Sequence, residues 1–402
     1  MTSLSAATPA AATVPETPDF SMVLGGPLFQ LFRQARLTGD GLELLVRRIL
    51  VITVVAWLPL LLLSLADGSA LSANLKIPFI YDVETHARLL VALPVLIFAE
   101  LVVHQRISPV VRRFVERGIV AGADIAKLTE AINSTLRARN SVVLEVSLLV
   151  FVYTIGILGW RTGAVGVASW YASPRDNHLN LTLPGYWFGY VSIPIFQFIL
   201  FRWYIRLALW FRLLWKISRL NLHLTAAHPD RAGGLGFVGR ASYAFGPILF
   251  AQGVVLSGLI ASRVLYDGQN LLTFKMEAAG LVAGLVLVVL GPLTMFTPAM
   301  DSAKRNGSVE YGLLANRYVF GFEEKWIRGG PPDMTELLGS GDIQSLADLG
   351  NSYSVIGEMR VVPFSFSDML RLAGATAAPL VPLMLTIFSL EEVITRLIKI
   401  VL

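Results

Sequence analysis

The stretch from His228 to Phe237 concentrates the groups with the clearest chemical potential in this chain. Pro229 restricts His228 to an extended backbone, and three glycines permit backbone angles that are closed to other residues. The pattern predicts a tight loop that exposes backbone amides shortly before an apolar helix. Such amides, together with Arg231, can hold a phosphate or a carboxylate. The glycines are Gly233, Gly234 and Gly236.

The same stretch allows other interpretations. His228 and Asp230 could form an acid/base pair, or the loop could be a rigid element that docks the surrounding helices. His223, His228 and Asp230 match no established metal-site spacing, so we expect no metal and no cofactor. The loop is not a Walker A motif, because the Gly-Lys-Ser/Thr ending is missing. It is not a dinucleotide fingerprint either, because no strand precedes it.

Charged residues inside apolar segments form a second candidate site. A carboxylate within a lipid-crossing helix is costly and is often retained for function. Glu100 and Glu145 lie about one helical turn from the same side of the membrane on successive predicted spans, at a depth similar to that of Arg202 and Arg206. The loop that begins at His228 is expected at the same level, near the inner face. We weigh a structural ion pair, for example Glu145 with Arg202, against a proton or cation relay that Gln197, Gln252 and Ser257 would extend.

A basic amphipathic helix follows the fourth predicted span. At 100° per residue its cations fall within an arc of about 140°. They are expected to meet anionic lipid headgroups, or, for the two nearest the hydrocarbon, to attract an anion in a vestibule. The cations are Arg202, Arg206, Arg212, Lys216 and Arg219.

The elements that must position these residues follow from composition. With 54% hydrophobic and 15% charged residues, and a mean hydropathy of +0.63, the chain is too apolar for a soluble protein of this length. We therefore expect an all-α polytopic transmembrane helix bundle in a lipid bilayer. The absence of cysteine excludes disulfides and thiolate chemistry. A pI near 9.4 is what the basic loops of a membrane protein produce, so no nucleic-acid partner is expected.

Apolar segments long enough for lipid predict six spans and a seventh that is kinked or re-entrant at Pro379 and Pro382. The segments cover residues 49–66, 89–103, 142–160, 187–201, 245–265, 278–296 and 369–388. Of the 33 lysine and arginine residues, 25 precede the first span or follow the second, fourth and sixth. Because basic residues concentrate on the cytoplasmic side, this alternation predicts a cytoplasmic amino terminus.

The remaining segments complete the predicted organisation. Helical spacing indicates cytoplasmic helices from Asp124 to Leu136, from Asp301 to Trp326 and from Asp342 to Met359, and the Gly329-Gly330-Pro331-Pro332 run separates the last two. We find no alternation of polar and apolar residues that is long enough for a sheet. A homo-oligomer is compatible with the amphipathic carboxyl-terminal helix. The predicted parts are a disordered tail (1–20), an interfacial helix region (21–48), a six-span membrane domain (49–300) with long cytoplasmic loops (104–141 and 202–244), a cytoplasmic helical segment (301–368), and the seventh segment with the terminal helix (369–402).

Several stretches resemble a group of bacterial integral membrane proteins that have no assigned activity. They are the His-Pro-Asp-Arg-Ala-Gly-Gly-Leu-Gly run from His228, residues 345–352, residues 358–364 and the Pro-Leu-Val-Pro run from Pro379. The resemblance implies a bacterial inner (cytoplasmic) membrane protein and transfers no catalytic residue.

Three functions are compatible with this sequence. We favour a channel or transporter for an ion or small charged solute with a polar inner vestibule, because broken spans, intramembrane charges and proline kinks suit a solute path. A membrane-embedded enzyme acting on a lipid or amphiphile would use His228, Asp230 and Arg231 at the cytoplasmic face, and we do not favour it. A non-enzymatic sensor or scaffold is the third.

Overall fold

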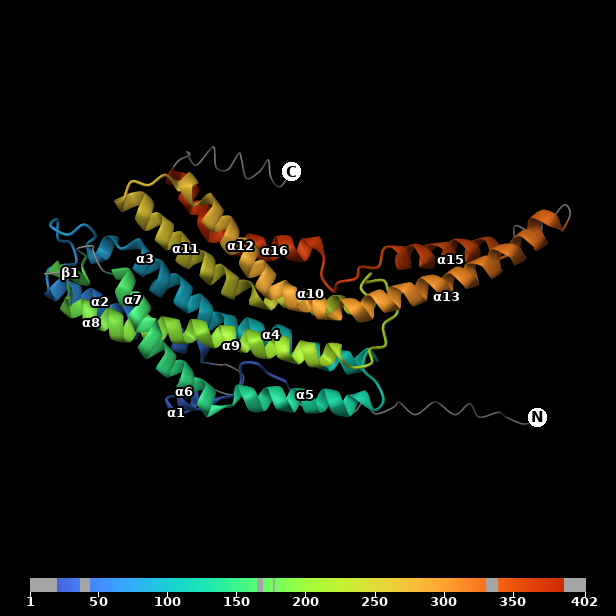
Figure 1. Ribbon diagram of the computed structural model, residues 1–402, viewed down its shortest axis with the longest axis horizontal. Coiled ribbons are helices and arrows are strands. Elements are labelled where there is room, and N and C mark those ends of the chain that lie inside the picture. Colours follow the sequence, from blue (N-terminus) through green and yellow to red (C-terminus); the bar gives the residue numbers. More distant parts are fainter. Residues whose placement is uncertain (1–19, 37–43, 165–168, 176–177, 330–338, 387–402) are drawn as a thin grey trace.

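A computed structural model describes residues 20–36, 44–164, 169–175, 178–329 and 339–386 as an all-α polytopic helix bundle (Figure 1). Seven helices in the described part are long and apolar enough to cross a membrane, which agrees with the predicted partition. They are Leu45–Ala66, Val83–Glu116, Val142–Arg161, Leu183–Ser218, Gly236–Tyr266, Leu271–Arg328 and Phe366–Leu385.

Most of these spans combine several helical elements. In chain order they are α2 (Leu45–Ala66); α3 (Val83–His86), η3 (Ala87–Ala92) and α4 (Leu93–Glu116); α6 (Val142–Phe151), η4 (Val152–Gly156) and α7 (Ile157–Ala164); α8 (Leu183–Trp187), η5 (Phe188–Ser192) and α9 (Ile193–Ser218); α10 (Gly236–Ala241), η6 (Ser242–Phe245) and α11 (Gly246–Tyr266); η7 (Leu271–Phe274), α12 (Lys275–Leu290), η8 (Gly291–Phe296), α13 (Thr297–Glu323) and η9 (Glu324–Arg328); α16 (Phe366–Ala377) and η10 (Ala378–Thr386).

Proline explains several of these changes of helix type. The π-helical stretches η3 and η5 end just before Pro94 and Pro194, which lack the N–H that would continue an α-helix. Pro379 and Pro382 fall within the 3₁₀-helical η10, and the Ser257 hydroxyl donates a 2.7 Å hydrogen bond to the Pro379 carbonyl. The described part of the seventh segment is therefore a continuous helix that changes type at its prolines.

The spans lie roughly along the long axis of the molecule (Figure 1). One end holds a hairpin of β1 (Ala172–Arg175) and β2 (His178–Leu181), together with the single turn η2 (Phe79–Tyr81). We call this the hairpin end. The opposite, basic end holds α5 (Asp124–Arg139), which packs along the second half of α9. The expectation of no sheet is wrong for this short hairpin, because a two-stranded ribbon needs only a few paired residues.

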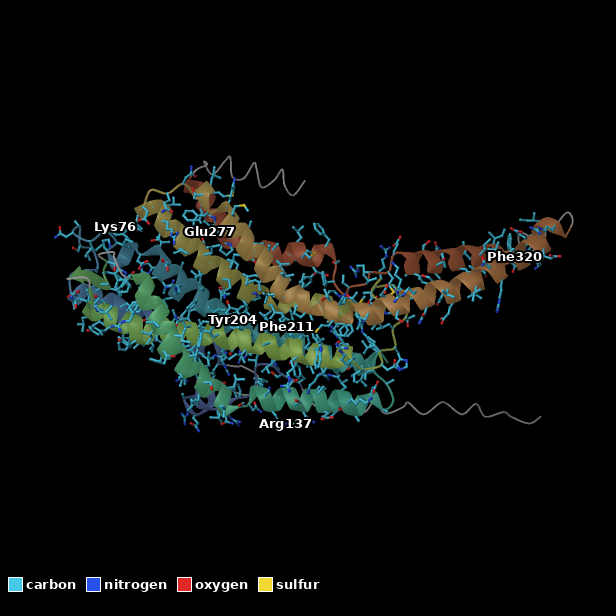
Figure 2. All side chains as sticks on the ribbon, viewed as in Figure 1. Lys76, Arg137, Tyr204, Phe211, Glu277 and Phe320 are labelled. Atoms are coloured by element: carbon cyan, nitrogen blue, oxygen red, sulfur yellow. The ribbon has the colours of Figure 1, made fainter. Side chains whose placement is uncertain are left out.

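An arm extends from the basic end. It consists of α13, η9 and α15 (Asp342–Gly357), and carries Phe320 far from the bundle (Figure 2). The helix from Leu271 to Arg328 has 58 residues. At 1.5 Å per residue that is about 87 Å, against roughly 30 Å of membrane hydrocarbon. The predicted helices on either side of the Gly329-Gly330-Pro331-Pro332 run are thus confirmed as the two helices of this arm.

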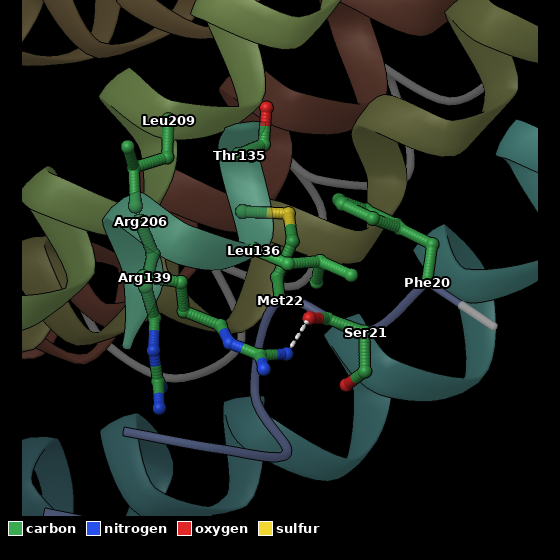
Figure 3. A pocket seen from close by; sticks show the side chains of 8 residues that line it. All are labelled: Phe20, Ser21, Met22, Thr135, Leu136, Arg139, Arg206 and Leu209. Atoms are coloured by element: carbon green, nitrogen blue, oxygen red, sulfur yellow. Dashed lines mark hydrogen bonds between the residues drawn. The ribbon is translucent and has the colours of Figure 1, made fainter. Parts of the chain in front are cut away.

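The amino-terminal segment differs from its prediction. Of residues 21–36, the first described part of the predicted interfacial helix region (21–48), only α1 (Pro27–Gln34) is helical, because Gly25 and Gly26 adopt positive φ angles of 133° and 94°. Phe20 is buried and lies 6.2 Å from the Trp210 ring, between centroids, where the chain crosses α5 and α9 (Figure 3). Residues 1–19 of the predicted tail and the predicted terminal helix at residues 391–402 lie outside the described residues.

We expect Gly253→Ala to destabilise the bundle. A Cβ at this position would clash with the backbone carbonyl of Thr376, where α11 packs on α16, and overpacking of this kind costs about 1–3 kcal/mol. A thermal unfolding curve in detergent should shift to lower temperature. Gly280→Ala is the matched control, because a Cβ there has open space within 4 Å. An equal effect of both substitutions would contradict the close approach of the two helices.

Candidate functional site

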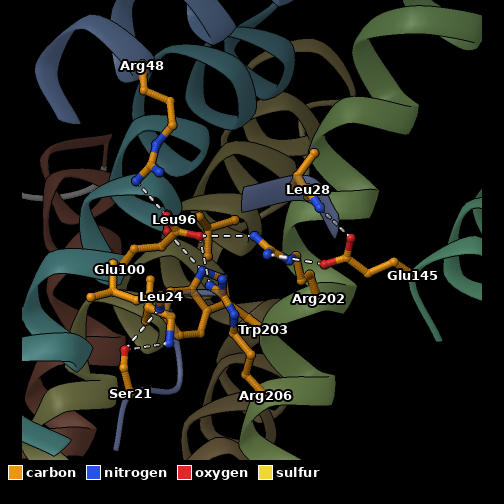
Figure 4. Close-up of polar contacts among 11 residues, drawn as sticks. Ser21, Leu24, Leu28, Arg48, Leu96, Glu100, Glu145, Arg202, Trp203 and Arg206 are labelled. Atoms are coloured by element: carbon orange, nitrogen blue, oxygen red, sulfur yellow. Dashed lines mark hydrogen bonds and ion pairs between the residues drawn. The ribbon is translucent and has the colours of Figure 1, made fainter. Parts of the chain in front are cut away.

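Five charged side chains from four spans meet near the basic end of the bundle (Figure 4). One carboxylate, Glu100, is contacted by three guanidinium groups: Arg48 at 2.5 Å, Arg206 at 2.8 Å and Arg202 at 3.3 Å. Arg202 also lies 3.3 Å from Glu145, so the predicted ion pair between these two residues is present. We call this group the five-charge cluster.

The residues of the five-charge cluster are almost fully buried, so their stability depends on how closely the opposite charges pair. The exposed fractions of its residues lie between 1% and 8%. Removing an ion from water costs several kcal/mol, which its partners offset only when they are close and hydrogen-bonded. Glu100 meets this condition through its contacts with three arginines. Glu145 meets it through Arg202 and through the Leu28 amide, which donates a 2.7 Å hydrogen bond from α1.

The fourth span holds its two arginines in place by local packing. Arg202 and Arg206 are four residues apart on α9 and therefore share one helix face. The indole of Trp203 donates a 2.8 Å hydrogen bond to the Leu96 carbonyl of α4, and the Arg206 guanidinium lies 4.9 Å from the centroid of the same ring. The depth of both arginines is thus fixed relative to Glu100.

The cluster contains one arginine that sequence reasoning did not select. Arg48 directly precedes the first predicted span (49–66) and counts among the basic residues expected on the cytoplasmic side, yet only 1% of it is exposed. Its Nε atom has no hydrogen-bond partner within the described residues. The available signal was its position: an arginine at the start of one span and a glutamate near the same end of another lie at comparable depth.

The polar vestibule predicted beside Arg202 and Arg206 is closed in this conformation. Residues 20–34 lie against the cluster, and the two cavities that they line beside Arg206 have volumes of only about 10 Å³ each. That is about the space of one water molecule. Figure 3 shows the cavity between Phe20, Met22 and Arg206. We call residues 20–34 the amino-terminal cover.

Arg139 secures the amino-terminal cover from α5. Its guanidinium donates a hydrogen bond to the Ser21 carbonyl, and the Ser21 hydroxyl lies 3.0 Å from Nδ1 of His104. Burial and the nearby positive charge of Arg206 lower the pKa of Arg139 to about 10. Arg139 therefore holds the cover from a largely buried position close to Arg206.

The rest of the basic face of α9 is partly exposed: Arg212 and Arg219 are exposed, and Lys216 is half-buried. Arg212 and Lys216 both donate hydrogen bonds to the Ser134 hydroxyl of α5, at 3.2 and 3.1 Å. The other polar residues expected to line a path are also hydrogen-bonded. Gln197 donates to the Gly156 carbonyl, and Gln252 donates to the Tyr204 hydroxyl.

The loop from His228 is held together by one carboxylate. Asp230 accepts hydrogen bonds from the amides of Ala232 (2.8 Å), Gly234 (3.1 Å) and Gly236 (2.9 Å). Burial acts to raise the pKa of Asp230, but these amides and the adjacent His228 outweigh it and hold the pKa below its ordinary value. The amides that could have held a phosphate are thus already occupied by the protein's own carboxylate.

The same loop docks the arm onto the bundle. The guanidinium of Arg360 donates a 3.0 Å hydrogen bond to the Asp230 carbonyl, and its amide donates a 2.8 Å hydrogen bond to the Arg231 carbonyl. Arg231 adopts a φ of 53°, and its side chain pairs with the exposed Glu358 at 2.9 Å. Gly233 and Gly234 also have positive φ angles, so the loop geometry depends on them.

His228 and Asp230 do form a pair, since Nδ1 of His228 lies 2.9 Å from Oδ1 of Asp230. His228 faces a surface cavity of about 370 Å³ together with Arg117 and His223. Within the described residues, no group of three or more histidine, aspartate or glutamate side chains is arranged to hold a metal ion.

The two candidate sites are not adjacent. The loop packs beyond the end of α4, where the His223 amide donates a 2.8 Å hydrogen bond to the Ile119 carbonyl. From Glu100 to Arg117 the chain is 17 residues, about 26 Å of helix. The prediction that both sites lie at one depth is therefore wrong, because α4 continues well past the apolar segment.

No family model matches the chain, and searches of curated proteins and of solved structures find no match either. The bacterial resemblance inferred from its motifs accordingly stays a prediction.

We expect Glu100→Gln to destabilise the protein by about 3–5 kcal/mol, because it leaves three buried guanidinium groups without their shared carboxylate. Thermal unfolding in detergent measures the loss. Lys76→Gln serves as the control, since its pair with Asp267 is half-exposed and contributes about 0–1 kcal/mol. A loss no greater than that of the control would mean that water solvates the cluster.

We expect Asp230→Ala to make the loop from His228 to Phe237 more flexible, because the amides that Asp230 binds lose their hydrogen-bond acceptor. Hydrogen bonds to a charged group contribute about 1.5–3 kcal/mol each, so hydrogen exchange of the amides of Ala232, Gly234 and Gly236 should accelerate at least tenfold. In the wild type, ionised Asp230 stabilises the folded loop above the pKa of about 3.9 that this carboxyl has in the unfolded chain. The stabilisation disappears as the pH falls through the lower pKa of Asp230 in the folded protein. Glu358→Gln, in an exposed pair, should leave exchange unchanged; similar rates in both variants would refute the role of Asp230.

Proposed function

We propose that this integral membrane protein transports a small anion, with the five-charge cluster as the constriction on its path. The observation that carries the proposal is an excess of positive charge: three guanidinium groups share two carboxylates, and Nε of the almost fully buried Arg48 has no hydrogen-bond partner among the described residues. A cluster built only for stability would gain from balanced charge, because an unpaired buried ion is costly.

The amino-terminal cover closes the cluster with few polar contacts. The Leu28 amide donates a hydrogen bond to Glu145, and the centroid of the Phe32 ring lies 5.6 Å from the Arg48 guanidinium. Beside the cluster, Ser21 contacts Arg139 and His104, and Phe20 packs against Trp210. A segment held this way can leave without breaking the spans, so displacement of residues 20–34 would open the cluster from the predicted cytoplasmic side.

The enzyme alternative gains less support from the site. The Oδ1 atom of Asp230 that lies 2.9 Å from His228 also accepts hydrogen bonds from the amides of Ala232 and Gly234, so this carboxylate already serves the structure of the loop. A scaffold function remains compatible with the arm and does not account for the buried charges.

The proposal is tested by anion flux into liposomes that contain the purified protein. We expect uptake of chloride, phosphate or lactate, and a several-fold increase when Phe20→Ala and Met22→Ala together weaken the cover. Arg206→Gln should reduce uptake at least tenfold in the weakened background. Arg212→Gln is the matched control on the same helix, because its side chain is bonded only to Ser134 among the interactions described.

Gel filtration and thermal unfolding confirm that each variant is folded. Flux of potassium or sodium instead of anions would overturn the choice of anion. The absence of flux for all of these ions from folded wild type and from the weakened variant would overturn the transport function.

A further inference from the structure

The helix α13 has two contrasting faces. One face packs on α15 and its flanks: the Tyr318 hydroxyl donates a 3.0 Å hydrogen bond to the Asp342 carbonyl, and the Trp326 indole, just beyond α13, donates a 3.0 Å hydrogen bond to the Asp342 carboxylate. Near its start, Gly307 is buried against Ala226 and Ile356. The face on the other side of the helix carries large apolar side chains that are 55–68% exposed.

These exposed residues follow the spacing of a coiled-coil seam. They recur alternately three and four residues apart over two heptads, within an arc of about 80° at 3.6 residues per turn, roughly opposite the face that packs on α15. The seam consists of Asn306, Val309, Leu313, Asn316 and Phe320, all exposed. We call these five residues the arm seam, and Phe320 marks its far end in Figure 2.

The charges beside the arm seam select the partner. Arg305 precedes the first seam residue and Glu310 follows the second, so they occupy the positions five residues apart that pair between the helices of a parallel, in-register dimer. Two such opposite-charge pairs would form by symmetry. Arg317 and Glu324, on the same flank as Glu310, would face Gly312 and Val319 of the other helix, so no like charges meet.

Insertion in a membrane also favours a parallel pair of arms. Copies inserted in one bilayer share one orientation, so arms that leave the same side run parallel and present identical surfaces to each other. Asn306 and Asn316 then face their own counterparts, where an amide can both donate and accept a hydrogen bond. A polar residue in a seam specifies register and oligomer state.

We propose that two copies of this chain pair along α13 as a parallel, in-register coiled coil. The arm seam is about 22 Å long and about 10 Å wide, which gives roughly 220 Å² per copy, well below the ~800 Å² per partner of a stable soluble complex. Confinement to the bilayer raises the effective concentration and compensates for the small area. The dimer therefore belongs to the membrane-embedded protein.

Cysteine cross-linking tests the pairing directly, because the natural chain contains no cysteine. Val309→Cys, Leu313→Cys and Phe320→Cys are introduced one at a time into the full chain, and membranes are oxidised before a non-reducing gel. We expect each variant to give at least fivefold more dimer than Leu314→Cys, a control that is 51% exposed but lies off the arm seam. An antiparallel pairing would cross-link Val309→Cys with Phe320→Cys, and would not link both variants to themselves.

A charge exchange provides an independent readout. Arg305→Glu and Glu310→Arg should each reduce cross-linking of Leu313→Cys about threefold, and the double exchange should restore it. Equal cross-linking at the seam positions and at Leu314→Cys would overturn the proposal, since that is the result of random collision. So would the absence of cross-linking in protein that gel filtration shows to be folded.

Discussion

The contact of one carboxylate, Glu100, with three buried guanidinium groups is the constraint on which the bundle depends. None of these ions is tolerable alone in a low-dielectric interior, so α2, α4 and α9 must meet at this depth and register. Arg202 also pairs with Glu145 of α6, and Glu145 accepts a hydrogen bond from the Leu28 amide in the first turn of α1. The positions of α6 and α1 therefore depend on the same charges. A single network thus fixes the relative positions of four spans and the amino-terminal cover.

The cost of burying charge also distinguishes the five-charge cluster from the His228 loop. The five-charge cluster closes the bundle and leaves one arginine incompletely bonded, whereas the His228 loop, about 26 Å further along α4, satisfies its own amides and anchors the arm. Buried charge without full pairing among the described residues is costly, and we propose that a transported anion completes the pairing. Complete pairing, as at Asp230, suits a rigid joint.

The arm shows what a bilayer adds to an ordinary helix surface. In solution, a narrow seam of three apolar and two amide side chains would be too small to hold two proteins together. In a membrane, orientation is shared and distance is limited, so we propose that this weak, self-complementary seam is sufficient to pair two copies. The 58-residue helix that begins at Leu271 carries this surface beyond the bundle, past the joint formed by Asp230 and Arg360.

Hydrophobic segment length determined the position of seven apolar segments from the sequence alone, because lipid requires long apolar helices, but it did not show how far the helices continue beyond them. The pairing of Glu145 with Arg202 was also predictable from their common depth. Only the tertiary structure showed that Arg48 joins Glu100, that residues 20–34 fill the expected vestibule, and that Asp230 occupies the loop amides. These outcomes depend on helix rotation and on contacts between distant segments, which hydropathy and local spacing do not encode.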